Sequence, residues 1–205
     1  MTASRERGFT LIELVLALSI VAAMLAIVFG GLRVAIRAWQ SGEQRTETLQ
    51  HARSLSALLS QSLGGTTAYL AASEPGAQAD VLFQGEPDKL SFVTVAPPFP
   101  LPAPIAFTAV TLSVDEGERP GFAVREKALP NDDPFELGTP IAVDPSLTAV
   151  HFRYLRDIPD SWEEQWDGVQ ERSLPKAVEV TLTAMVGGQA VEQPPVLVSI
   201  RVNAP

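Results

Sequence analysis

The sequence predicts an α+β protein in which a long N-terminal helix, membrane-spanning in its first half, packs on a mainly antiparallel β head. The first observation is that residues 14–32 contain no ionisable side chain. At about 1.5 Å of rise per helical residue, such a run nearly crosses a hydrocarbon core of about 30 Å. The second observation is that apolar and polar residues alternate in the second half of the chain, which is the period of strands with one buried face.

The helix is expected to continue beyond the membrane, because residues 33–63 contain no proline and their apolar residues recur at steps of three and four. One face of this second half is made by Leu49, Ala52, Ser56, Leu59 and Leu63. Gly64 and Gly65 are a natural stop, since glycine is common just past a helix end.

Strands are predicted wherever the period changes to two. Four runs alternate clearly: 110–114, 150–154, 178–182 and 196–202. Two further strands are expected at 90–95 and 122–126. The proline-rich run 97–104 predicts a stiff, extended connector, and the stretches 130–145 and 157–172 predict long loops.

A distinctive motif precedes the apolar run. Arg5 and Arg7 lie in a short leader that ends in Gly8, and Phe9 and the sequence Thr-Leu-Ile-Glu-Leu follow. Glu13 therefore lies just inside the apolar segment, where an acidic residue costs up to about 3 kcal/mol near mid-membrane. This combination resembles the prepilin-type cleavage and methylation segment of type IV pilins and type II secretion pseudopilins.

The resemblance implies that a prepilin peptidase cuts after Gly8 on the cytoplasmic side and methylates the new N-terminal Phe9. The chain would then divide into a leader (1–8), a transmembrane helix segment (9–32) and a periplasmic head (33–205). We expect Glu13 to pair with an N-terminal amine and so direct assembly. The alternative is an ordinary signal anchor with a stray acid, and Glu13 separates the two because a simple anchor has no use for it.

Blocks in the second half resemble the J-type minor pseudopilin of type II secretion: 152–154, Trp162 and Trp166, and 174–182. The resemblance implies a head with two β-sheets and a structural role in nucleating or capping the pseudopilus tip. Its implied partners are I- and K-type minor pseudopilins and the major pseudopilin. Another minor pseudopilin, a type IV minor pilin, or a signal-anchored periplasmic enzyme or binding protein are the alternatives.

Composition narrows the function classes. The chain has 205 residues, 46% of them hydrophobic and 19% charged, which fits one globular domain plus an anchor. The formal net charge of −9 argues against nucleic acid as a partner. There is no cysteine to form a disulfide or a thiolate site. Because Arg5 and Arg7 precede the apolar run, the protein is expected to cross the bacterial inner membrane once, with its head in the periplasm.

The sequence contains no motif that predicts a catalytic site or a metal site. His51 and His151 lack a nucleophile elbow or a zinc-binding motif nearby, so we predict surface or interface residues, no catalytic residue and no cofactor. The acidic groups at 115–118 and 132–133 lack EF-hand spacing, and no metal site is predicted. Trp162 and Trp166 are four residues apart, which favours packing on one side of a helical turn over an exposed aromatic patch.

Overall fold

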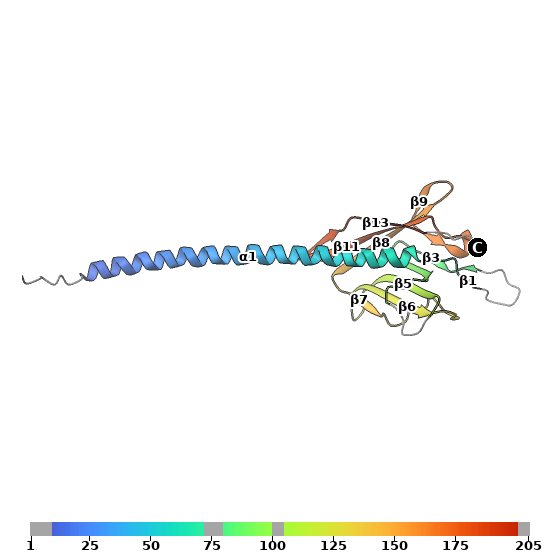
Figure 1. Ribbon diagram of the computed structural model, residues 1–205, viewed down its shortest axis with the longest axis horizontal. Helices are drawn as coiled ribbons and strands as arrows, with labels where there is room; N and C mark the ends of the chain where they lie inside the picture. The colour runs from blue at the N-terminus through green and yellow to red at the C-terminus, as the bar shows by residue number, and fades with distance from the viewer. Residues whose placement is uncertain (1–9, 72–79, 100–104, 201–205) are drawn as a thin grey trace, which may run out of the picture. The chain divides into compact units, whose positions relative to one another are not determined.

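The computed structural model describes residues 10–71, 80–99 and 105–200, and within α1 the side chains of 37–50 and 52–53 are not described. The chain forms two compact units, residues 1–50 and residues 51–205. The first unit holds most of the helix α1, and the second holds its C-terminal end together with the β head (Figure 1).

Helix α1 runs from Leu11 to Gly64, which is 54 residues. It ends at the glycine pair that the sequence marks as a stop. Gly65 N donates to Gln61 O at 3.0 Å, and a Cβ added at Gly65 would lie 2.8 Å from both Ala96 Cβ and Thr94 Oγ1. Glycine is therefore needed here because the chain passes close to the sheet as it leaves the helix.

The larger sheet has six strands in the order β10-β3-β4-β5-β6-β7, and every pairing is antiparallel. Its strands are β3 (Phe83–Gly85), β4 (Lys89–Thr94), β5 (Thr108–Asp115), β6 (Gly121–Ala128), β7 (Ala142–Asp144) and β10 (Trp166–Asp167). The predicted strands at 90–95, 110–114 and 122–126 are thus confirmed as the centre of one sheet.

The second sheet has five antiparallel strands, in which β11 pairs with β8 on one side and with β12 and β13 on the other. Its strands are β8 (Leu147–Arg156), β9 (Ser161–Glu163), β11 (Ala177–Val186), β12 (Gln189–Glu192) and β13 (Val196–Ser199). A separate small sheet joins β1 (Leu70–Ala71) to β2 (Asp80–Val81). The head therefore has the two main sheets expected, with a third, two-stranded one in addition.

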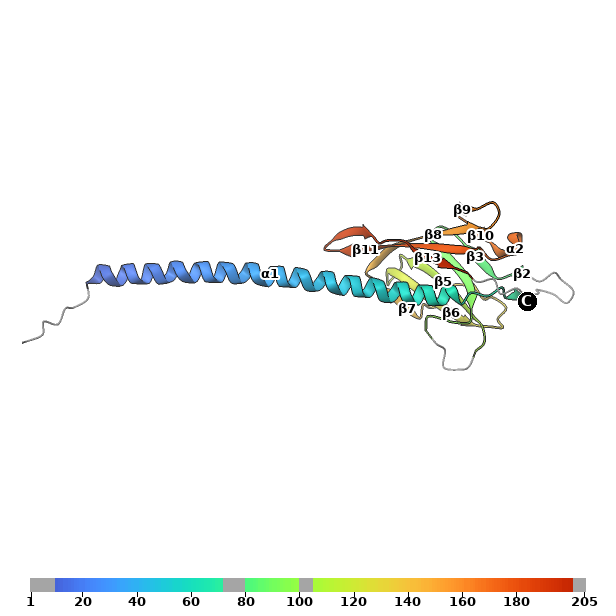
Figure 2. The same ribbon diagram turned by 45° about the horizontal axis from the view of Figure 1, so that its top comes forward.

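The core of the head lies where the end of α1 meets the inner faces of both main sheets (Figure 2). Its largest fully buried side chains are Leu59, Leu63, Phe83, Leu90, Phe92, Leu112, Phe122, Phe152 and Tyr154. Leu59 and Leu63 confirm part of the helical face that the sequence predicts, and the side chains of Leu49 and Ala52 lie outside the described residues. The inner-face pattern of β8 and β11 also follows the alternation.

Three expectations need correction. Strand β5 does not have a single buried face: Thr111 is also buried, and it shares a 3.0 Å hydrogen bond with Ser91. The stretch 130–145 is not all loop, because it contains β7. The stretch 157–172 is not one long loop, because after a turn at 157–160 it contains β9, β10 and the short helix α2 (Gly168–Glu171).

Candidate functional site

The sequence places its functional residues at the N-terminus. Gly8 and Phe9 lie outside the described residues, so their cleavage and methylation stay predictions. Glu13 lies in the first turn of α1. It lies near the start of the apolar span of that helix, Leu11–Ile36.

Thr10 and Glu13 bond reciprocally at the start of α1. Thr10 N donates to Glu13 Oε2 at 3.0 Å, Thr10 Oγ1 donates to the same oxygen at 2.9 Å, and Glu13 N donates to Thr10 Oγ1 at 3.4 Å. This is a capping box, in which two backbone N–H groups without helical partners are satisfied by side chains.

The capping box gives Glu13 a partner within its own chain before any cleavage. Sequence reasoning expected that partner to be an amine and missed Thr10. The signal was present, since a threonine three residues before a glutamate, ahead of an apolar run, is the signature of this cap. Within the described residues both bonds use Oε2, so Oε1 is left for a further donor.

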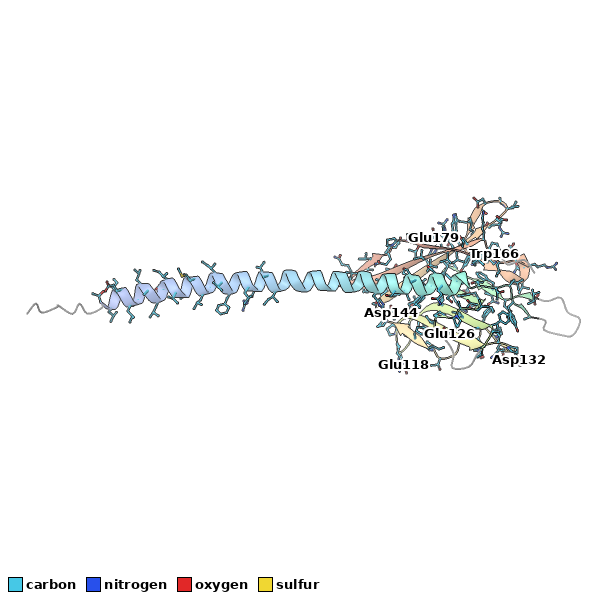
Figure 3. The ribbon with its side chains drawn as sticks, viewed as in Figure 1. Glu118, Glu126, Asp132, Asp144, Trp166 and Glu179 are labelled. Atoms are coloured by element: carbon cyan, nitrogen blue, oxygen red, sulfur yellow. The ribbon has the colours of Figure 1, made fainter. Side chains whose placement is uncertain are left out.

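Behind the cap, α1 contains a stretch long and apolar enough to cross a membrane. It covers Leu11–Ile36, 26 residues with a mean hydropathy of 2.8, and none of it is buried within the protein. Its side chains project on all sides of the helix (Figure 3). The hydroxyl of Ser19 donates to Val15 O at 2.8 Å, so this polar group is satisfied inside the helix, as a lipid environment demands.

The head brings His51 together with Asp144 and Ser146. His51 Nε2 lies 2.5 Å from Asp144 Oδ2, while Asp144 Oδ1 accepts from Ser146 N at 3.0 Å and from Ser146 Oγ at 2.6 Å. Burial raises the pKa of Asp144, but the bonds from Ser146 and His51 outweigh it and leave that pKa below its ordinary value.

The order of these three groups argues against a hydrolytic site. In a serine triad the histidine lies between the serine and the carboxylate and takes the serine proton. Here Asp144 lies in the middle, and the Ser146 hydroxyl donates to it. The three residues instead fasten the helix to the end of β7.

His151 lies elsewhere, on β8, with its Nε2 2.9 Å from Glu164 Oε2. Both histidines are exposed, which confirms them as surface residues. Of the acidic groups considered for calcium, Asp115 pairs with Arg125 instead. Among the residues that the structure describes, no three His, Cys, Asp or Glu side chains gather closely enough to hold a metal ion.

Comparison with known proteins identifies the family. Residues 30–193 match the family described as type II secretion system (T2SS), protein J. The chain belongs to this family. Residues 3–29 match the prokaryotic N-terminal methylation motif. The type II secretion system protein J of Xanthomonas campestris pv. campestris is 27% identical over 204 residues, covering 96% of this chain and 93% of that relative.

The chain is therefore a minor pseudopilin of type II secretion, a structural subunit of a pseudopilus that it builds with other pseudopilins. Its N-terminal apolar helix fits anchoring in the inner membrane, and residues 3–29 carry the methylation motif. The family accounts for both the methylation motif and the apolar helix at the N-terminus. It leaves the two tryptophans of the head to be explained by their surroundings.

Trp166 of this pseudopilin is a core residue. Its side chain is 5% exposed, and its Nε1 donates to Ser173 O at 2.9 Å (Figure 3). The guanidinium of Arg156 lies over the ring, 5.0 Å from its centre, and bonds both oxygens of Glu171 at 2.6 and 2.9 Å. Packing, which the sequence favoured, is thus confirmed for Trp166.

Trp162 is only half-buried and lies on β9, with the Arg153 guanidinium 5.4 Å above its ring. The two tryptophans do not share a helical turn, which corrects the expected geometry. They belong to strands of different main sheets, β9 and β10. Each is stacked against an arginine of β8, so the stretch 157–172 is held by tertiary contacts rather than by its own periodicity.

Proposed function

We propose that this pseudopilin is made as a precursor that a prepilin peptidase cleaves after Gly8 and methylates on Phe9. Residues 9–32 then form the membrane segment, and residues 33–205 form a head in the periplasm. The match of residues 3–29 to the methylation motif supports the cleavage. The arginines of the leader support the orientation, because basic residues favour the cytoplasmic side.

We further propose that the mature protein works at the tip of the pseudopilus, in a complex with the I- and K-type minor pseudopilins and next to the major pseudopilin. The observation that supports this best is the single helix α1, whose exposed apolar span continues into turns buried in a folded head. Such a subunit can leave the membrane only by exchanging lipid for the apolar surfaces of other subunits. Glu13 is its assembly residue.

The proposed role is structural rather than enzymatic. Family membership supports this, as does the arrangement around His51, in which the serine hydroxyl is bonded to a carboxylate and not to the histidine. An acidic protein of net charge −9 is also a poor partner for nucleic acid.

Intact-mass measurement tests the processing. Co-expression with a prepilin peptidase should give a chain that begins at N-methylated Phe9. Gly8→Lys should abolish this product, because a long charged side chain replaces the small residue before the cut. Ser4→Lys is the matched control, since it adds the same charge within the leader and should be processed normally. A Met1 terminus retained with active peptidase would contradict the proposal.

Orientation and assembly are tested on the same full-length chain. Because the protein has no cysteine, Glu118→Cys gives a single thiol on the exposed turn between β5 and β6. A membrane-impermeant maleimide should label it in cells with a permeabilised outer membrane. Co-purification in detergent with the other pseudopilins of the same organism should yield a stable complex. A thiol that reacts only after lysis of the inner membrane would rule out a periplasmic head.

A further inference from the structure

The hairpin between β8 and β9 presents one large apolar side chain to solvent. Ile158 in its turn is 86% exposed, the highest fraction among the large apolar side chains that the structure describes. The turn stands clear of the other strands of the head in both views (Figures 1 and 2). A single exposed isoleucine is unremarkable on its own, so the inference depends on what surrounds it.

The hairpin is braced where its two strands meet the turn, because Arg156 pairs with Ser161 there. Arg156, the last residue of β8, bonds Glu171 through two nitrogens, lies 3.5 Å from Glu163 and stacks on Trp166. The hydroxyl of Ser161 bonds Glu163 at 2.9 Å across the start of β9. A side chain on a turn that is already braced in the free protein loses less conformational freedom when it binds, which favours affinity.

The tip is also negatively charged. Asp157 and Asp160 flank Ile158 and are exposed. Lys176 approaches Asp157 at 3.3 Å, and both side chains are more than half exposed, so this surface pair is weak. An apolar tip between two carboxylates fits an apolar pocket with a positive rim.

A second copy of this chain fits the tip poorly. The head does contain an apolar groove of about 370 Å³, lined by Leu55, Leu58 and Phe99 among others. However, its lining includes Asp144, which is bonded to His51, and among the described residues contains no lysine or arginine to match the acids of the tip. The net charge of −9 also opposes contact between copies.

We propose that the β8–β9 tip is a docking knob, whose Ile158 enters an apolar pocket rimmed by lysine or arginine on a pseudopilus subunit of another kind. The proposal rests on membership in the pseudopilus. It assigns one contact within the proposed complex to this turn of the head. A few residues buried at the centre of an interface carry most of its binding energy.

In vivo photo-crosslinking of the full-length chain tests the knob. Benzoylphenylalanine at position 158, in a strain that expresses its secretion system, should crosslink to another pseudopilin, identified by mass spectrometry. The same probe at Leu137, which is 56% exposed in the loop before β7, is the matched control and should not. The proposal would be overturned if position 158 crosslinked only to a second copy of this chain or only to an exported protein. It would also be overturned if crosslinks at position 158 were no more frequent than at position 137.

Complex recovery in detergent provides the second measurement. Ile158→Asp should weaken the complex with that pseudopilin about tenfold, equivalent to about 1.4 kcal/mol. Leu137→Asp should leave it unchanged. Asp160→Lys should weaken the complex less than Ile158→Asp does. Its effect should be larger at low salt than at high salt, because salt screens the charges. Because both substituted apolar residues are exposed, their thermal unfolding should match that of the wild type.

Recovery of the wild-type complex is measured first, so that a failure of the assembly proposal can be told from a failure of the docking knob. If the wild-type chain binds no other pseudopilin, both the assembly proposal and the knob are wrong. If the wild-type complex forms and Ile158→Asp recovers it equally well, only the knob is wrong.

Discussion

The two ends of α1 contain the same kinds of side chains in opposite surroundings. In the span, Leu14 and Leu18 are 58% and 61% exposed, whereas at the other end Leu59 and Leu63 are 1% and 0% exposed. The span is apolar all round. The last turns before the head are apolar on one side only, and Gln61 on the helix there is exposed.

The difference shows that the distribution of leucines around a helix, more than their number, indicates which solvent the helix is built for. A helix that is apolar on every side requires lipid or a bundle of other helices. A helix with one apolar side turns that side toward a single core. One continuous element therefore has two separate energetic roles, and each can be disturbed without the other.

The largest effect is expected from shortening a buried leucine. Leu59→Ala should lower the free energy of unfolding of the head by roughly 2–5 kcal/mol, because it leaves a cavity where the helix meets both sheets. Urea unfolding of the full-length chain in detergent, followed by tryptophan fluorescence, to which the buried Trp166 of the head contributes, measures this.

Leu16→Ala is the matched control for that measurement. Leu16 is an exposed residue of the span, so the same truncation there should leave the unfolding of the head unchanged. An unchanged urea midpoint for Leu59→Ala would show that the two ends of α1 do not differ as described.

The converse change should disturb the anchor alone. Leu18→Lys places a charge inside the apolar span, at a cost of up to about 3 kcal/mol for insertion. We expect a smaller alkali-resistant membrane fraction, with unfolding of the head unaltered. Leu137→Lys introduces the same charge at an exposed leucine of the head and should not change membrane extraction. If both variants extracted equally, the span would not be the anchor.

Much of this architecture could be predicted because its signals are long and periodic. The uncharged run 14–32, the glycines that end α1 and the alternation of β8 and β11 each repeat a pattern over many residues. Burial of whole faces is what such patterns record.

The short elements could not be predicted in the same way. Strands β9 and β10 and helix α2 have two to four residues each, too few to show a period. They are ordered by distant partners, such as Arg156 with Glu171. Thr111 was misread for a related reason, since its burial depends on a hydroxyl partner, Ser91, on the neighbouring strand.

At the N-terminus the sequence indicated Glu13 but not how it is held. Its position within an apolar run marks it as needing a partner. The two hydrogen bonds that Thr10 donates to Glu13 follow from the spacing of a threonine three residues before a glutamate. The exposed Ile158 could not be recognised from sequence, because the pairing of β8 with β9 determines which residue occupies the turn.

The polar start of the span is expected to contribute to assembly through the charge of Glu13. A charge pair about 4 Å apart, at an effective dielectric near 20, attracts by about 4 kcal/mol before desolvation. If Glu13 pairs with a Phe9 amine, Glu13→Leu should keep cleavage and insertion but reduce crosslinking to neighbouring pseudopilins and reduce secretion.

Glu13→Gln separates the charge from the cap. The amide can still accept from Thr10 N, so a cap worth about 0.5–2 kcal/mol is partly kept while the charge is lost. Equal assembly defects in the Gln and Leu variants would assign the effect to the charge. Normal assembly in the Gln variant would assign it to the cap and contradict ion pairing. The three measurements are peptidase processing, crosslinking and secretion in the same strains.

The smallest effect is expected at the junction where α1 enters the head, through Asp144. Hydrogen bonds from Ser146 and His51 outweigh burial and lower the pKa of Asp144 in the folded state. A carboxyl whose folded pKa is depressed contributes stability above its unfolded pKa of about 3.9, and this contribution is lost as pH falls through the folded value. The free energy of unfolding of Asp144→Asn should therefore fall less with acid than that of the wild type. The difference should be no more than about 1 kcal/mol for so accessible a pair.

Asp132→Asn, which removes an exposed carboxylate from a loop, is the control, and urea midpoints between about pH 5 and pH 2 are the measurement. An acid response of Asp144→Asn identical to that of the wild type would show that this contact does not fasten the helix to β7.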